Sequence, residues 1–212
     1  ERPDAVYCWG TEEPIELLSP EGIQSIKPSL EPDGNSASEG VLARMHDGSF
    51  FALTRLQPAV WDAVPHVRDV GVGLQHSCFI AGNQQLWCSG VNPYGQLGLG
   101  MVPLRVEPVQ ARGVAGAVSL ALGENHSCAL LDNGTVRCWG LSSRLGTSDS
   151  IEHGAPAVVV ENLEQVEDLV AGDEHTCAQR QNGEVFCWGS GANGRLGTGE
   201  QISQLVPYRV TY

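Results

Sequence analysis

Cysteine and histidine are the side chains of this sequence with the greatest potential for chemistry, because they can bind zinc, form disulfides or act as nucleophile and base. The 212 residues contain seven cysteines and six histidines. Six cysteines form three pairs with members ten residues apart: Cys78 and Cys88, Cys128 and Cys138, Cys177 and Cys187. A histidine precedes each pair by two positions, and these histidines, His76, His126 and His175, are 50 and then 49 residues apart. Such a period indicates a repeat architecture.

The ten-residue spacing is typical of two cysteines facing each other across a β-hairpin. Between the middle pair lies Asp132-Asn133-Gly134, whose glycine can adopt the positive φ that a three-residue hairpin loop needs. Gln181-Asn182-Gly183 repeats this turn, whereas Ala81-Gly82-Asn83-Gln84 places its glycine earlier and can turn differently. Residues equidistant from a hairpin turn lie within reach of a disulfide.

A copy of the hairpin without cysteines supports the same pairing. In residues 40–52, Gly48 aligns with Gly134, and the two cysteine positions hold Leu42 and Ala52. Both cysteines are therefore missing together, as expected for a bonded pair, because a lone remaining thiol is a liability. The sequence predicts three disulfides within hairpins: Cys78–Cys88, Cys128–Cys138 and Cys177–Cys187.

Zinc is the competing interpretation of regularly spaced cysteine and histidine. A structural zinc site brings four ligands together, commonly from close Cys-x₂₋₄-Cys pairs, and the ten-residue spacing suits a hairpin better. Histidines at equivalent positions belong to the cores of different repeats, where we expect local backbone hydrogen bonds to satisfy them. We therefore expect no metal site.

No arrangement of residues typical of catalysis is evident either. The sequence has no nucleophile elbow and no phosphate-binding loop. Glu12-Glu13 and Asp173-Glu174 are adjacent carboxylates, but neighbours on a strand point to opposite faces. The sequence predicts a protein that is not an enzyme and has no cofactor.

The repeated unit continues beyond each hairpin. Gly95-Gln96-Leu97-Gly98 and Gly194-Arg195-Leu196-Gly197 follow two of the hairpins, and the shorter Ser143-Arg144-Leu145-Gly146 follows the third. We expect a proline-led strand next, from Pro108, Pro156 or Pro207, and then a strand leading to the following Gly-x-x-His.

This order of Gly-x-x-His-Ser/Thr, hairpin, Trp-Gly, Gly-x-Leu-Gly and proline-led strand resembles the regulator-of-chromosome-condensation repeat family. The resemblance is strong from about residue 67 to 210, and its disulfide-bearing form is similar to that of extracytoplasmic bacterial proteins. It implies an all-β β-propeller, complete or partial, whose four-stranded blades span about 45–50 residues. Activities in the family include nucleotide exchange, chromatin binding, light sensing and β-lactamase inhibition, and none of them follows from the repeat alone.

The domain organisation predicted is a single propeller-type repeat domain over residues 1–212, diverged in 1–65 and well matched in 66–212. Cys8-Trp9-Gly10 matches the end of a hairpin, so the partner of Cys8 would lie before the first residue. Cys8 is thus predicted to be unpaired or bonded to another chain. Three explanations remain open: part of a longer propeller, a small or open propeller, or a propeller completed by another chain. The first residue is glutamate, so either a targeting segment has been removed or the chain is an excerpt.

Residues 12–65 are less regular. Residues 14–18 and 23–26 resemble the two strands between hairpins, and the polar, turn-rich segment over 28–38 predicts an exposed loop. Trp61 is the only tryptophan that is not adjacent to a cysteine, and it is either a core residue or a contact residue.

Charge and cysteine usage limit the partners and the compartment. The formal net charge of −13 argues against nucleic acid and anionic membranes as partners, because phosphate neutralisation needs lysine and arginine. No stretch of the sequence has the apolar length of a membrane span. Three disulfides predict an oxidising compartment, so we expect a secreted, periplasmic or cell-surface protein.

The function predicted is a non-enzymatic, extracytoplasmic protein-binding scaffold whose partner contacts the loops at the blade ends. The candidate contact loops are 28–40, 91–95, 141–144 and 190–195, with Tyr94, Arg144, Arg195 and Trp61 as candidate anchors, since aromatic and arginine side chains are favoured at hot spots. The alternative is a structural subunit of a larger complex or surface assembly, whose open propeller edge is completed by another chain.

Overall fold

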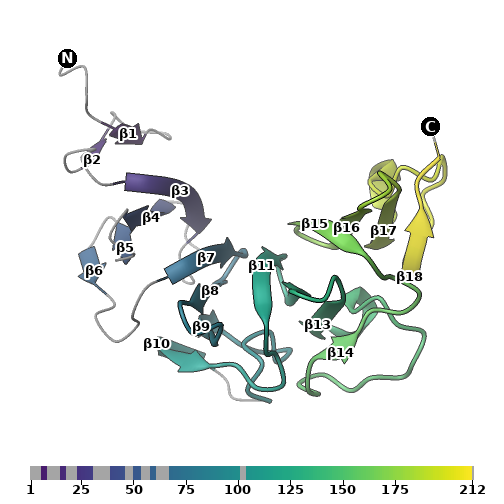
Figure 1. Cartoon of the computed structure of the whole chain (residues 1–212), viewed down its shortest axis with the longest axis horizontal. Helices are drawn as coiled ribbons and strands as arrows, with labels where there is room; N and C mark the ends of the chain where they lie inside the picture. Colours follow the sequence, from purple (N-terminus) through teal and green to yellow (C-terminus); the bar gives the residue numbers. More distant parts are fainter. Residues whose placement is uncertain are drawn as a thin grey trace.

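The fold was analysed in a computed structural model, which describes residues 67–100 and 104–211 together with the backbone of six strands between residues 6 and 60. Side chains are described for 67–100 and 108–211. The described part of the chain contains eighteen strands in five antiparallel sheets, of which four have four strands each and one has two. The sheets follow one another in chain order along an open arc (Figure 1). The protein is therefore all-β, with the architecture of a partial propeller.

Strands β1 to β6 form the first two sheets. The two-stranded sheet pairs β1 (Val6–Cys8) with β2 (Ile15–Leu17). The next sheet has the order β3 (Ile23–Leu30), β4 (Glu39–Met45), β5 (Phe50–Leu53) and β6 (Pro58–Val60). Leu42 lies opposite Ala52 in this sheet, so the alignment of the cysteine-free hairpin is confirmed.

The other three sheets are the blades that contain the predicted disulfides. One blade consists of β7 (Val67–Val72), β8 (His76–Ala81), β9 (Leu86–Val91) and β10 (Leu104–Gln110). The next consists of β11 (Ala117–Leu122), β12 (His126–Leu131), β13 (Val136–Gly140) and β14 (Val158–Val159). The last consists of β15 (Val166–Gly172), β16 (His175–Arg180), β17 (Val185–Gly189) and β18 (Gln204–Arg209). Short 3-10 helices, Ser142–Arg144 and Ala192–Gly194, follow β13 and β17.

All three predicted disulfides are confirmed. The bonds Cys78–Cys88, Cys128–Cys138 and Cys177–Cys187 each join residues directly opposite across a hairpin, with Cα atoms 4.1 Å apart. These six cysteines are therefore not available as thiolate ligands for zinc. The side chains of Cys8 and Trp61 lie outside the described residues, so the calls on them remain predictions.

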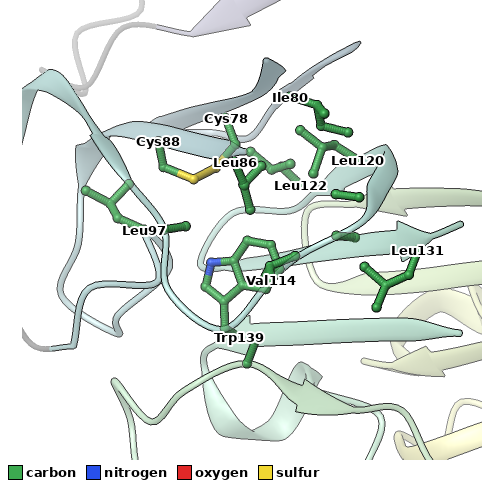
Figure 2. Close-up of a cluster of buried hydrophobic side chains, with 14 residues drawn as sticks. Cys78, Ile80, Leu86, Cys88, Leu97, Val114, Leu120, Leu122, Leu131 and Trp139 are labelled. Carbon is green, nitrogen blue, oxygen red and sulfur yellow. A yellow bond between two sulfur atoms is a disulfide. The ribbon is translucent and has the colours of Figure 1, made fainter. Parts of the chain in front are cut away.

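The hydrophobic core lies between neighbouring blades. Alternate residues of β8 point to opposite faces, so Cys78 and Ile80 face the β11–β14 blade whereas Phe79 and Ala81 pack on the other side. Figure 2 shows this interface, where Trp139 of the second blade meets side chains of the first. An equivalent cluster joins the β11–β14 blade to the β15–β18 blade. Each blade is therefore buried on the faces that its neighbours cover.

Two strand predictions need correction. The predicted loop over 28–40 is shorter, because β3 continues to Leu30 and β4 begins at Glu39. Pro28 lies in an edge strand of its sheet, the place in a sheet where proline is found most often. Pro108 and Pro207 lie inside β10 and β18 instead of beginning them, and pairing shifts register in both of these edge strands.

No helix of the described residues is long and apolar enough to cross a membrane.

The hairpin turns explain where glycine is needed. Gly134 and Gly183 have φ of 77° and 83°, as predicted. The first turn closes with the same two backbone hydrogen bonds, from Gln84 to Ala81 and from Ala81 to Gln85, so it does not turn differently. Gln84 therefore occupies the left-handed position with φ of 62°, which costs a non-glycine residue about 1–2 kcal/mol.

At this turn position, introducing a glycine and removing one should change the free energy of unfolding in opposite directions. Gln84→Gly should raise the free energy of unfolding by about 1 kcal/mol, and Gly183→Ala should lower it by about 1 kcal/mol, because no atom would crowd a side chain at Gly183 and only φ matters. Urea unfolding of both variants measures the effect. Gln85→Gly, one position away, is the control and should not stabilise; a stabilising control would show that the left-handed φ is not the cause.

Candidate protein-binding face

The candidate contact residues Tyr94, Arg144 and Arg195 lie on one end of the blades, beside a set of buried polar contacts that join each blade to the next. The turns between first and second strands and the loops between third and fourth strands share this end, because successive strands of a blade are antiparallel. We call the surface formed by residues 73–75, 91–100, 123–125, 141–155, 173–174 and 190–203 the loop face.

Each buried histidine bonds to the following blade. The Nε2 atom of His76 lies 2.7 Å from Oγ of Ser127, and Nε2 of His126 lies 2.9 Å from Oγ1 of Thr176. The hydroxyl of Ser127 donates to the carbonyl of Gln96, so His76 must supply the proton of its own bond to Ser127. The expectation of local backbone hydrogen bonds for these histidines was wrong, because their partners lie one repeat further along the chain.

The glycine of Gly-x-x-His makes room for the imidazole ring. A β-carbon added to Gly123 would lie 2.1 Å from Cε1 of His126 and 2.7 Å from the carbonyl oxygen of Asp173 in the next blade. That carbonyl accepts a backbone hydrogen bond from Glu124 at 2.7 Å. The motif therefore allows two backbones and a ring to meet where the blades join.

A tryptophan forms the second connection between blades. The indole N–H of Trp139 donates to the carbonyl of Gln96 at 2.7 Å, and that of Trp188 donates to the carbonyl of Arg144 at 3.1 Å. Gln96 and Arg144 occupy the same position of the Gly-x-Leu-Gly loop and its shorter form. Each loop thus receives the tryptophan of the following blade.

The β7–β10 blade is an exception that supports this pairing of a tryptophan with the loop of the preceding blade. The β7–β10 blade has Ser89 where the later blades have Trp139 and Trp188. In the sequence, the repeat before it lacks Gly-x-Leu-Gly. The donor and its acceptor loop are therefore missing together at the same junction.

Burial keeps the joining histidines neutral. Removal from water lowers the pKa of His76 and of His126 to about 3, and nearby positive charge contributes: His126 for the former, Arg144 and His175 for the latter. The pKa of His175 is also lowered, by burial and by Arg195, against the opposing effect of Asp173 and Glu174. His76 and His126 are therefore hydrogen-bonding groups of the core and not general bases poised near neutral pH.

The two candidate arginines converge on one carboxylate. Arg195 donates to Oε2 of Glu174 at 2.8 Å, and Arg144 of the preceding blade donates to Oε1 at 3.4 Å. Arg144 is the more covered, with 16 % of its side chain exposed against 27 % for Arg195. The three groups carry a surplus of one positive charge, so the pair of arginines both joins two blades and leaves a cationic point on an acidic protein.

Tyr94 lies at a different place on the loop face. Its ring makes an edge contact with His153 of the next blade, with centroids 5.3 Å apart. The carbonyl of Tyr94 accepts a hydrogen bond from the N–H of Gly154 at 3.1 Å. Tyr94 is half-buried and His153 exposed, so their rings form a fixed aromatic ledge between two blades.

Sequence reasoning missed Glu174 and His153 as members of this surface. Glu174 was set aside as one of two adjacent carboxylates, and His153 lies in the β13–β14 connection at a position that none of the repeat motifs defines. The signal for Glu174 lay in the two loops that carry arginine at the same repeat position, Arg144 and Arg195, since paired arginines need a carboxylate.

Comparison with known proteins agrees with the repeats seen in the structure. The family model described as the regulator of chromosome condensation (RCC1) repeat matches residues 67–96, 117–144 and 166–195, and a second model of that description matches 182–212. The chain belongs to the RCC1 repeat family. These matches follow the three disulfide-bearing blades.

Similar proteins share only part of their length with this chain. The human probable E3 ubiquitin-protein ligase HERC3 is 34 % identical over 98 residues, which are 44 % of this chain and 9 % of that protein. Human WBSCR16 has a similar fold with a TM-score of 0.81 and 19 % identity, over 94 % of this chain and 56 % of that one. Prp20p from Saccharomyces cerevisiae gives 0.77 and 22 %, over 94 % and 53 %. The chain thus spans about half of these solved structures.

The buried histidines should make stability depend on pH in one direction. An unfolded histidine takes up a proton as the pH falls through about 6.5, whereas His76 and His126 stay neutral in the folded protein down to about 3. The free energy of unfolding should therefore be at its full value above pH 6.5 and should decrease below it, by about 1 kcal/mol for each histidine between pH 7 and 5.5.

Urea unfolding at pH 7 and 5.5 tests this expectation. His126→Gln should lose about half of the pH dependence that the two histidines create, whatever its effect on stability at pH 7. A variant with the full pH dependence of the wild type would show that His126 is not buried in its neutral form.

Proposed function

We propose that this chain is a non-enzymatic protein-binding scaffold of an oxidising, extracytoplasmic compartment, and that its partner binds the loop face. In this proposal residues 1–212 are one repeat domain, of which 1–65 are the diverged part. RCC1-repeat proteins bind other proteins, as the solved complex of Kap60 with yeast RCC1 illustrates for that protein. Disulfides persist in oxidising compartments, and the three hairpin disulfides support that location.

The contact of Tyr94 with His153 carries the proposal. Two rings from neighbouring blades are held edge to face at 5.3 Å, so a partner would find a preformed aromatic surface with little side-chain entropy left to lose. Arg144 and Arg195 add a cationic point that is already ordered by Glu174. Rigid aromatic and arginine side chains are the residues that most often dominate protein interfaces. We expect a partner that brings an acidic or aromatic group to these loops.

Substitution of the aromatic ledge tests the proposal. The double variant Tyr94→Ala and His153→Ala should keep the unfolding midpoint close to that of the wild type, because both rings lie at the surface, and should weaken the native partner at least about tenfold. Quantitative cross-linking capture from the source organism, with wild type and variant compared on the same partner, measures the loss.

Glu164→Ala is the matched control for this measurement. Glu164 is exposed on the opposite end of the last blade, in the connection before β15. It should leave partner recovery unchanged. Equal recovery with wild type and the double variant would exclude the ledge as the contact surface, and a loss with Glu164→Ala would place the partner on the other end.

A further inference from the structure

The turn between β12 and β13 carries a sequence that binding at the loop face does not use. Asn133-Gly134-Thr135 follows the pattern Asn-x-Ser/Thr, and the only other such sequence in the chain is Asn125-His126-Ser127. This pattern is the acceptor of N-linked oligosaccharides in secreted proteins, where it lies on the surface. Asn133 is exposed between the two strands of its hairpin, so a bulky oligosaccharide has room there.

The turn itself explains why an asparagine is present. Each of the three disulfide-bearing hairpins has an asparagine at this position, namely Asn83, Asn133 and Asn182. In each turn, Oδ1 of the asparagine accepts the backbone N–H of the residue two positions further along, at 3.0–3.1 Å. The asparagine alone therefore indicates a hairpin turn and no modification.

The residue that supplies this N–H decides whether the amide nitrogen of the asparagine is engaged. In two of the turns this residue has a long polar side chain that returns to the asparagine. Nδ2 of Asn83 donates to Oε1 of Gln85 at 2.8 Å, and Nδ2 of Asn182 donates to Oε2 of Glu184 at 3.0 Å. These two amide nitrogens are therefore hydrogen-bonded within their own turns.

Threonine at the same place leaves the amide nitrogen of the middle turn free. The hydroxyl of Thr135 donates to Oδ1 of Asn133 at 2.7 Å, so both contacts of Thr135 are with the oxygen. A backbone N–H can only donate, which fixes the oxygen on this side and directs Nδ2 away from it. Within the described part of the chain, Nδ2 of Asn133 has no acceptor. The free nitrogen and the hydroxyl two positions on thus occur together at this turn and at neither of the equivalent ones.

The backbone of this turn is held on both sides of the asparagine. The N–H of Asp132 donates to the carbonyl of Gly116 at 2.9 Å, and the N–H of Val166 donates to the carbonyl of Gly134 at 3.0 Å. Asn133 itself is exposed, so a sugar on Nδ2 would extend into solvent without displacing a buried side chain. It would stand on the end of the blades opposite the loop face.

We propose that Asn133 is an attachment site for an N-linked oligosaccharide, which the secretory pathway transfers from a lipid diphosphate carrier. Nδ2 forms a bond to the anomeric carbon of the first sugar, and the bond from this carbon to the diphosphate oxygen breaks. Nδ2 gives up one proton, the carrier leaves as the lipid diphosphate, and nothing is oxidised or reduced. The inference rests on the extracytoplasmic location in the proposed function.

An oligosaccharide at this position would restrict where a protein partner can bind. A bulky, hydrated chain would cover the end of the middle blade on which Asn133 lies and leave the loop face open. Asn125, the asparagine of the other sequence, belongs to the loop face. The hydroxyl of Ser127 is buried and donates to the carbonyl of Gln96 at 2.9 Å. We therefore expect Asn133 to be modified and Asn125 to be unmodified.

Mass spectrometry of the protein from its native source tests the proposal. A protease that cleaves before Asp132 places Asn125 and Asn133 in separate peptides. The Asn133 peptide should carry a mass of hexosamine and hexose units that peptide-N-glycosidase removes, leaving an aspartate labelled from heavy-oxygen water. A sample without the enzyme is the control, because an Asn-Gly sequence also deamidates spontaneously to aspartate.

Three variants of the whole chain, secreted from glycosylating cells, separate the sequence requirement from the turn. Thr135→Ala should lose the oligosaccharide and Thr135→Ser should keep it, since only the second retains a hydroxyl. Glu184→Thr gives Asn182 the same sequence at an equivalent turn and is the control for transfer. This variant should carry a second oligosaccharide.

The proposal is overturned if the Asn133 peptide of the native protein is unmodified. It is also overturned if the secreted wild type is unmodified while Glu184→Thr is modified at Asn182, since the transferase then reached the chain and did not use Asn133. Modification of Asn125 would instead contradict the proposed function, because it would cover the loop face. Thr135→Ala should leave recovery of the loop-face partner unchanged, so the two proposals fail independently.

Discussion

The junction between blades depends on a hydrogen bond from a buried, neutral imidazole to a hydroxyl one repeat further along. Its cost is the removal of a titratable ring from water, which lowers the pKa of His126 to about 3. The hydrogen bond can form because Gly123 leaves room for the ring against the backbone. The indole N–H of Trp188 adds a second hydrogen bond across the same junction, to the carbonyl of Arg144. The Cys128–Cys138 disulfide lies within the hairpin that carries His126 of this junction and Trp139 of the preceding one, so it stabilises the strand pair whose faces form the core on either side.

The contacts between blades also hold the groups of the loop face in place relative to one another. Arg144 belongs to one blade and Glu174 to the next, and the same is true of Tyr94 and His153. Surface groups from different repeats are thus held next to each other by the buried polar contacts that join the blades. A scaffold of this kind recognises a partner with several loops at once, and each loop is free to change without loss of the core.

Much of the fold was predictable from the sequence because its signals are local. A ten-residue cysteine spacing around a glycine turn defines a hairpin, and the joint replacement by Leu42 and Ala52 defines its register. The partner of His76 was not predictable, since Ser127 lies 51 positions away and period alone does not tell which blade a side chain faces. The same holds for the candidate site: arginine at a repeated loop position was visible, whereas Glu174 between two arginines is a product of packing. Gln84 shows the limit of turn rules, because the hairpin imposes a left-handed φ on a residue that disfavours it.

The paired absence at the β7–β10 blade bears on how such chains can be rearranged. Ser89 replaces a tryptophan where the preceding repeat offers no Gly-x-Leu-Gly loop. Excision of the β11–β14 blade would bring the indole N–H of Trp188 to the carbonyl of Gln96 and the hydroxyl of Thr176 to the imidazole of His76, so the same two kinds of contact would be available. Excision of the β7–β10 blade would instead leave the indole of Trp139 facing a repeat without an acceptor loop. The repeats are therefore not interchangeable, because the donors of each repeat match the acceptors of the repeat before it. Gain or loss of a repeat leaves stability unchanged only where the donors and acceptors at the new junction also match.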